Sequence, residues 1–222
     1  MQSRDEIDLV NSEIKHINIS SCEFYNNGST SGPGVMLIDY PEGYDLYSIW
    51  LEGNVFRHNS SQLSAPIVEI FNENSNITPD QLDGESKRSL TMRNNTFEEN
   101  GSHGYGVIDI EEMPNVEISE NNRFSSNTDS HDFDTKVLSY FIDNGYYLKD
   151  NIKQDEFSSC YATIFLSRCI NVIISDLKIE HNSCDASMES SKGFSSGLVL
   201  SYLTEGELSI LSSDILNNKC DN

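Results

Sequence analysis

Two carboxylates occupy matching positions in two similar short stretches of the chain. Glu69 is the fourth residue of "PIVEI", and Asp109 is the fourth residue of "GVIDI". Carboxylate oxygens are suitable ligands for Ca²⁺, and paired acids catalyse the cleavage of glycosidic bonds. Acid–base catalysis also calls for a third polar group at the same place, usually a carboxylate, Arg, Lys or His. The equivalent positions in "GVMLI" and "KVLSYFI" hold Leu37 and Ser139, so the pair has no such neighbour and we expect no enzyme, metal or cofactor.

Two further segments contain residue types used in catalysis. "DSHDFD", Asp129 to Asp134, resembles the Asp-Pro-His-Asp/Glu motif of alginate epimerases, but it lacks the proline and does not lie on an expected strand. His103 lies in the Gly-rich "GSHGYG". We interpret both as loop residues.

A repeat positions these residues. Its pattern is an alternating apolar stretch, then an aromatic residue or Ile, then two residues and Asn. Copies are "INISSCEFYNN", "IWLEGNVFRHN", "LTMRNNTFEEN", "VEISENNRFSSN", "VIISDLKIEHN" and "LSILSSDILNN", with a degenerate copy in "YYLKDNIKQDEFSSC". Alternation with a period of two indicates strands, and variable spacing places insertions between them. The repeat predicts an all-β fold, a right-handed parallel β-helix of about seven coils, in one domain over 1–222.

The repeat places residues of one type in columns. Aromatic or aliphatic rungs should stack inside, at Phe24, Phe56, Phe97, Phe124, Phe157, Ile179 and Ile215. Amide rungs should stack at a corner, at Asn27, Asn59, Asn100, Asn127, Asn182 and Asn218. Amides both donate and accept hydrogen bonds, so stacked copies satisfy one another. A shorter amide column should hold Asn54, Asn95 and Asn121, with Cys22 at the same level.

A second set of apolar residues should point outward beside the carboxylates. Its members are Val35, Leu37, Ile67, Val107, Val137, Phe165, Leu198 and Leu200. An open apolar stripe of this length is costly in water, so we expect a loop or a partner surface to cover it.

The charge of the chain restricts its partners. Acidic residues outnumber basic ones by 36 to 14, which gives a formal charge of −22. So negative a surface repels phosphate backbones and anionic lipids, which argues against nucleic-acid binding. No apolar run is long enough to insert into a membrane.

Phe-x-x-Asn followed by a Gly-rich apolar stretch resembles the repeats of chlamydial polymorphic outer-membrane proteins, and also large protist surface proteins with a pectin-lyase-like β-helix. The likeness covers nearly the whole chain, although the family's Gly-Gly-Ala-Ile appears only as "GPGVML" and "GYGVID". The resemblance implies secretion, surface display and adhesion, and it transfers no catalytic residue.

Neither end of the chain shows a capping element, and an uncapped β-helix exposes unpaired strand edges. We expect an excerpt of a longer solenoid, with an end-to-end filament subunit as the alternative. The leading function is an extracellular structural or adhesive module at the cell surface. A polysaccharide lyase, hydrolase or epimerase is a further alternative. Expected partners are protein neighbours, packed end to end or laterally, and glycans.

Cysteines and sequons give more local predictions. Cys184 and Cys220 each follow an Asn rung by two residues, so a coil stack places them as neighbours for a disulfide, with Cys160–Cys184 as the alternative and Cys22 and Cys169 free. Sequons occur at Asn18, Asn27, Asn59, Asn76, Asn94 and Asn100. Rung asparagines point inward, so we expect any glycans on Asn18, Asn76 or Asn94.

Overall fold

The structure is a computed structural model that describes residues 16–30, 32–39, 48–61, 66–71, 88–102, 106–129, 163–185, 197–201 and 206–221. All regular elements in these ranges are strands, and they form four sheets in which every pairing is parallel. This arrangement is consistent with a parallel β-helix, so the all-β and parallel-stranded part of the prediction is confirmed.

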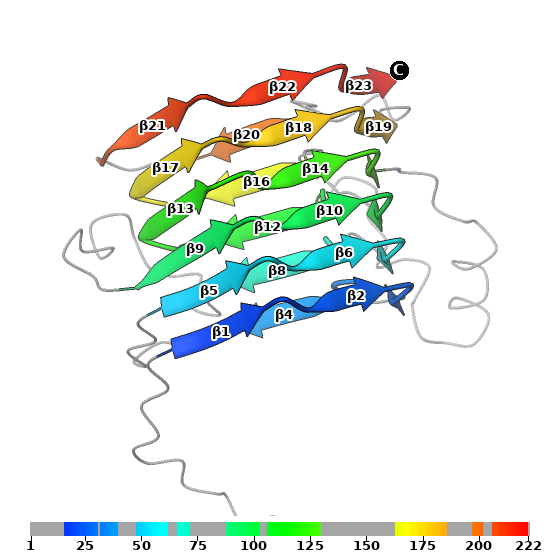
Figure 1. Cartoon of the computed structure of the whole chain (residues 1–222), viewed down its shortest axis with the longest axis horizontal. Helices are drawn as coiled ribbons and strands as arrows, with labels where there is room; N and C mark the ends of the chain where they lie inside the picture. The colour runs from blue at the N-terminus through cyan, green and yellow to red at the C-terminus, as the bar shows by residue number, and fades with distance from the viewer. Residues whose placement is uncertain are drawn as a thin grey trace, which may run out of the picture.

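The four sheets, named A to D in the order in which the chain visits them, stack strands from successive coils (Figure 1). Sheet A contains β1 (His16–Ser20), β5 (Ser48–Glu52), β9 (Ser89–Arg93), β13 (Asn115–Ser119), β17 (Asn171–Ser175) and β21 (Leu208–Leu211). Sheet B contains β2 (Glu23–Tyr25), β6 (Val55–Arg57), β10 (Thr96–Glu98), β14 (Arg123–Ser125), β18 (Lys178–Glu180) and β22 (Asp214–Leu216).

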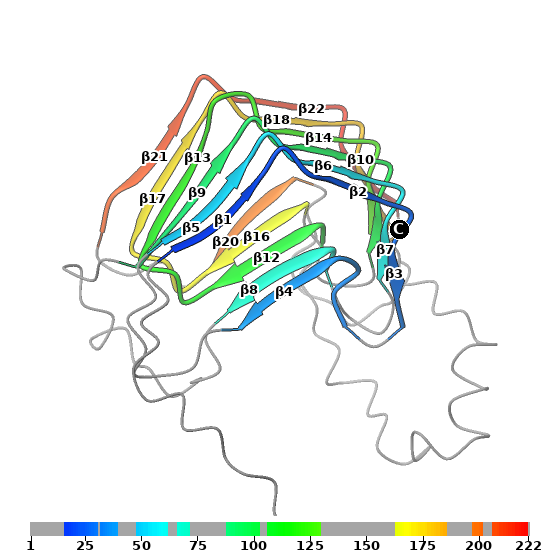
Figure 2. The same cartoon turned by 60° about the horizontal axis from the view of Figure 1, so that its bottom comes forward.

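The other two sheets complete each coil. Sheet C contains β3 (Gly28–Ser29), β7 (Ser60–Ser61), β11 (Gly101–Ser102), β15 (Thr128–Asp129), β19 (Ser183–Asp185) and β23 (Lys219–Asp221). Sheet D contains β4 (Met36–Asp39), β8 (Val68–Phe71), β12 (Ile108–Glu111), β16 (Ile164–Ser167) and β20 (Leu198–Ser201). A coil therefore runs out along sheets A and B and returns along sheet D, and successive coils superpose (Figure 2).

Register brings equivalent residues of the repeat together. Ile17 pairs with Ile49, and Ile49 pairs with Leu90, so one apolar column runs along sheet A. Alternate residues of sheet A face the interior, where Ile49, Leu51, Leu90 and Met92 have no exposed surface. Each such side chain stabilises the fold by about 1.5–3 kcal/mol relative to leaving it in water.

Sheet D begins with a repeated β-bulge. The backbone amides of Ile67 and Val68 both donate to the carbonyl oxygen of Val107, at 3.0 Å each. The next coil repeats this, with Val107 and Ile108 both donating to Thr163. A bulge interrupts the alternation, so two consecutive residues face the core.

This bulge makes the predicted outer apolar stripe wrong at four of its residues. Ile67 and Val107 are buried in the core, and Val35 and Leu198 pack against it. Of the residues assigned to the stripe, Leu37 and Phe165 share the outward column of sheet D with the carboxylates. Val137 lies outside the described residues, as does the side chain of Leu200.

The predicted rung Phe157 lies outside the described residues. β14 pairs directly with β18, which sets Phe124 against Ile179 with no strand between them. The repeat predicts a rung at Phe157 between these two residues. In the described part of the chain, three sheets have six strands each and sheet D has five.

Corners between the sheets use left-handed backbone at non-glycine residues. Asn94 precedes the rung Asn95 with φ 54°, and Glu99 precedes the rung Asn100 with φ 53°. L-residues adopt this conformation at a cost of about 1–2 kcal/mol, so other contacts must hold each corner. No described segment forms a helix that could cross a membrane.

Candidate functional site

Glu69 and Asp109 lie side by side on the outward column of sheet D. The two residues are register partners on β8 and β12, with Leu37 next in line on one side and Phe165 on the other. The repeat predicts Ser139 at the position that Phe165 occupies, because it counts one more coil between β12 and β16. Ser139 lies outside the described residues.

Asp109 has an unusual environment for an acid. The residue is only 2 % exposed, and its Oδ1 atom has no hydrogen-bond partner among the described residues. Burial, with smaller contributions from the negative charges of Glu111 and Glu69, raises the pKa of Asp109 to about 9. The carboxyl group is therefore protonated at neutral pH, which removes the cost of burying an unpaired charge.

An ion pair lies at the next corner. Glu112, at φ 59° and buried, accepts a hydrogen bond from the guanidinium of Arg168 one coil away. The pKa of the neighbouring Glu111 is raised, because burial raises it more than the positive charge of Arg168 lowers it. Sequence reasoning missed this pair, although aligning "IEEMPNVEI" with "LSRCINVII" puts Arg168 over Glu112.

Among the described side chains, the acidic residues of sheet D are too few to form a metal centre. In the described ranges, no three His, Cys, Asp or Glu side chains come together in a group that could hold a metal ion. Nearby Cys169 is a free, buried thiol whose pKa burial raises to about 12, so it is a poor metal ligand at neutral pH.

The second candidate feature is the column of asparagines at the corner between sheets B and C, called here the long ladder. Within it, Asn59 donates from its backbone amide and from Nδ2 to the Oδ1 atom of Asn100, at 3.0 Å each. Nδ2 of Asn59 also donates backwards to the carbonyl of Phe24 at 2.9 Å. The same bonds recur through the column, which consists of Asn27, Asn59, Asn100, Asn127, Asn182 and Asn218.

The aromatic rungs stack beside the long ladder. Ring centroids are 4.7 Å apart for Phe24 and Phe56, 4.4 Å for Phe56 and Phe97, and 4.6 Å for Phe97 and Phe124, with nearly parallel planes. Ile179 and Ile215 continue the column by register. The spacing matches the separation of neighbouring strands, so register alone places the rings in contact.

A shorter column lies at the corner between sheets A and B and is called the short ladder. Asn95 donates from its backbone amide and Nδ2 to Oδ1 of Asn122, and Asn54 donates in the same way to Asn95. Cys22 takes the equivalent position in the neighbouring coil, because its backbone amide donates to the Oδ1 atom of Asn54. The predicted rung Asn121 is wrong: Asn121 is exposed, and Glu120 and Asn121 both adopt left-handed backbone, which moves the rung to Asn122.

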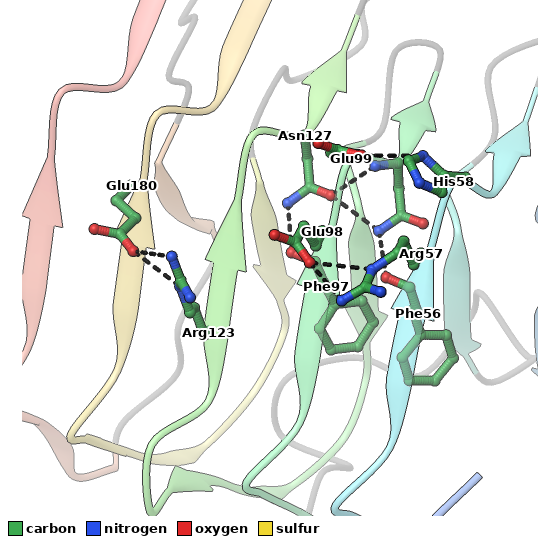
Figure 3. A network of polar contacts seen from close by, with 10 residues as sticks. Phe56, Arg57, His58, Phe97, Glu98, Glu99, Arg123, Asn127 and Glu180 are labelled. Carbon is green, nitrogen blue, oxygen red and sulfur yellow. Dashed lines mark hydrogen bonds and ion pairs between the residues drawn. The ribbon is translucent and has the colours of Figure 1, made fainter. Parts of the chain in front are cut away.

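Ion pairs cross between coils on the outer surface. Arg57 contacts Glu98 at 2.8 Å, Arg123 contacts Glu180 at 2.8 Å, and the imidazole of His58 lies 3.2 Å from Glu99 (Figure 3). On sheet A, Arg93 contacts Glu117 and Glu120 and lies over the ring of Trp50. These pairs are partly exposed, so each contributes little to stability.

The structure divides the sequons. Asn18 and Asn94 are exposed, whereas Asn59 and Asn100 are buried rungs whose amide nitrogens are already bonded. Asn27 is also a rung, but it is exposed because it belongs to the first described coil. Asn76 and His103 lie outside the described residues, as do positions 130–134 of the acidic segment "DSHDFD".

The cysteine positions are partly described. Cys184 on β19 and Cys220 on β23 are register partners, and neighbouring parallel strands hold Cα atoms at a separation that a disulfide can span. The structure does not describe their side chains, and Cys160 lies outside the described residues, so the disulfide stays a prediction. Cys22 is free and exposed.

Comparison with protein-family models, with curated proteins and with solved structures finds no match to this chain.

Proposed function

We propose that the chain forms a right-handed parallel β-helix that serves as a structural or adhesive module of an extracellular surface protein. We also propose that the chain is related to the repeats of polymorphic outer-membrane proteins. Both proposals rest on the repeated motif and on the contacts that this motif makes between coils.

The observation that carries the proposal is the long ladder. It uses the recurring element of the repeat, Phe-x-x-Asn, for contacts between coils: the ring stacks on the next ring, and the amide bonds to the next amide. The Phe and the Asn of the motif therefore serve the scaffold. A stack that is held coil by coil is an extended spacer with a long lateral surface.

Surface labelling tests the localisation. Lys178 and Lys219 are exposed, and a membrane-impermeant amine reagent applied to intact cells that make the protein should label them before lysis. Labelling only after lysis would contradict the extracellular assignment. Peptide mapping without reduction adds a second readout, because a Cys184–Cys220 bond requires an oxidising compartment.

One observation favours the alternative of a polysaccharide-active enzyme. Asp109 is a protonated acid beside Glu69, which is the arrangement of a general acid next to a second carboxylate. The low exposure of Asp109 weighs against access by a sugar chain. Release of reducing ends from acidic polysaccharides, abolished by Asp109→Asn and by Glu69→Gln, would support the enzyme over the scaffold.

A further inference from the structure

One rung of the long ladder has a side-chain amide that is chemically labile in a flexible chain. The buried rungs are Asn59, Asn100, Asn127 and Asn182. Among these four, Asn100 precedes a glycine, whereas serine or threonine follows each of the others. The backbone nitrogen that follows an asparagine can attack the side-chain amide carbon, and glycine hinders this attack least because it has no Cβ atom and the widest conformational range. Asn100 is therefore the most labile of the buried rungs.

The fold does not require the glycine at position 101. Gly101 pairs with Ser60 on one side and with Thr128 on the other, so its column accepts residues that have a Cβ atom. A Cβ atom built on Gly101 would meet no described atom within 4 Å apart from its own chain neighbours. Its backbone is also not left-handed, unlike that of Gly53. Packing therefore leaves room for a side chain, and the glycine acts mainly on the reactivity of Asn100.

The folded coil closes this site from both sides. Asn100 is 1 % exposed, and its Nδ2 atom donates to the carbonyl of Phe56 and to Oδ1 of Asn127, at 2.9 Å each. Its Oδ1 atom accepts from the backbone amide and from Nδ2 of Asn59, at 3.0 Å each. The attacking nitrogen is held as well, because the amide of Gly101 donates to the carbonyl of Asn59 at 2.9 Å. Neither reacting group can turn toward the other while these bonds persist.

We propose that Asn100–Gly101 is a site of spontaneous covalent modification, which the long ladder keeps closed and which opening of the coils exposes. In the first step, the backbone nitrogen of Gly101 loses its proton and bonds to Cγ of Asn100, while the bond from Cγ to Nδ2 breaks and ammonia leaves with that proton. In the second step, one water molecule opens the five-membered imide at either carbonyl and gives aspartate or isoaspartate. Water is the co-reactant, and the extracellular assignment plays no part in this inference.

The product cannot rebuild the ladder. A carboxylate at position 100 accepts hydrogen bonds but donates none, so the carbonyl of Phe56 would lose its donor and Oδ1 of Asn127 would face a second acceptor. The new negative charge would also lie in a buried place without a partner, which is costly. Isoaspartate adds one carbon atom to the main chain between β10 and β11 and shifts the strand register. The reaction therefore marks, irreversibly, a chain whose coils have opened at this level.

Peptide mapping by mass spectrometry measures the reaction at Asn100 in a mildly alkaline buffer. The folded chain should be modified at least about 100-fold more slowly than the same chain in urea, because the reaction requires an opened coil. Across a series of urea concentrations, the rate should rise with the unfolded fraction measured by circular dichroism. Equal rates in native buffer and in urea would overturn the proposal, and so would an Asn100 that stays intact in urea.

Two variants test the glycine and the ladder separately. Gly101→Ala keeps the rung and has space for its Cβ atom, so it should fold unchanged, and in urea its Asn100 should react at least about 10-fold more slowly. Asn127→Ala keeps the reactive pair but removes the acceptor of the Asn100 amide and Nδ2, so in native buffer Asn100 should react at least about 10-fold faster. An unchanged rate in either variant would contradict the role assigned to that residue. If Asn127→Ala does not fold, the urea series on the unchanged chain decides.

Dilution from urea tests the consequence of the reaction. Chains that carry aspartate or isoaspartate at position 100 should not regain the circular dichroism of the folded protein, whereas unmodified chains from the same sample should. Modified chains that refold to the original stability would overturn the irreversible step.

Discussion

The long ladder and the short ladder occupy neighbouring corners of the same coils, yet only the first is continuous. The long ladder has an asparagine at all six levels from Asn27 to Asn218. The short ladder ends after Asn122, and Leu177 and Ser213 take the next two levels. The difference shows what an amide supplies at a corner and what can replace it.

Asn122 shows the local adjustment at the end of the short ladder. Leu177 offers no side-chain oxygen, so Nδ2 of Asn122 donates to the carbonyl of Ser119 in its own coil at 2.6 Å, besides the carbonyl of Met92 at 2.8 Å. Leu177 is buried and replaces the missing bond with apolar contact. A corner therefore tolerates either a bonded amide or a packed aliphatic side chain.

The largest expected effect comes from breaking the long ladder at its centre. Asn100→Leu removes the acceptor of the Asn59 amide and Nδ2 and the donor to the carbonyl of Phe56. Several buried groups lose their partners at once, so we expect the free energy of unfolding to fall by about 3–5 kcal/mol. Chemical denaturation measures it. A loss below about 1 kcal/mol would mean that the ladder does not stabilise the stack.

A pH experiment extends the comparison to the buried carboxyl group of Asp109, whose Oδ1 atom has no hydrogen-bond partner among the described residues. The pKa of Asp109 is raised in the folded state to about 9, so between about pH 4 and pH 9 only the unfolded chain releases the proton. Stability should therefore fall as pH rises through this range, by up to about 1.4 kcal/mol per pH unit. Asp109→Asn should remove most of this slope and stabilise the fold at pH 8.

Glu117→Gln is the matched control for that slope. A hydrogen bond from Ser119 and the neighbouring Arg93 lower the pKa of Glu117, although burial opposes them. Its contribution is therefore present at neutral pH and is lost as pH falls below its ordinary value near 4.5. Thermal denaturation across pH should show opposite changes for the two variants, and the same change for both would contradict the assigned environments.

A smaller effect is expected where the short ladder is already interrupted. Leu177→Asn restores a side-chain oxygen for Asn122 but removes buried apolar surface, and these changes oppose each other. We expect a net change within about 2 kcal/mol, well below that of Asn100→Leu. Urea unfolding of the two variants side by side decides it, and equal losses would show that the two corners are not different in kind.

The smallest effect concerns the left-handed corners themselves. Ser126 has φ 55° and is exposed, so Ser126→Gly should relieve backbone strain and raise stability by up to about 1 kcal/mol. Ser126→Ala keeps the Cβ atom and therefore the backbone strain, so it should change stability by less than about 0.5 kcal/mol. A thermal shift in which glycine destabilises more than alanine would contradict the corner geometry.

Sequence reasoning predicted the columns because each copy of Phe-x-x-Asn keeps its internal spacing. It misplaced the rung at Asn121 because two adjacent asparagines satisfy the pattern, and only the left-handed backbone at Glu120 and Asn121 distinguishes them. It misplaced Ile67 and Val107 because strict alternation cannot reveal a bulge in which two amides share one carbonyl. The Glu112–Arg168 pair needed an alignment between coils, since the residues are far apart in sequence.

Hydrogen-bond detection by NMR tests the long ladder most directly. Nδ2 of Asn100 donates to Oδ1 of Asn127 at 2.9 Å, and Nδ2 of Asn127 donates to Oδ1 of Asn182 at 2.9 Å. Scalar couplings across these bonds, from each side-chain nitrogen to the carbonyl carbon of the next rung, should be observable, with slow exchange of the side-chain amide protons. Fast exchange at Asn100 and Asn127, with no coupling across either bond, would contradict the ladder and the coil register built on it.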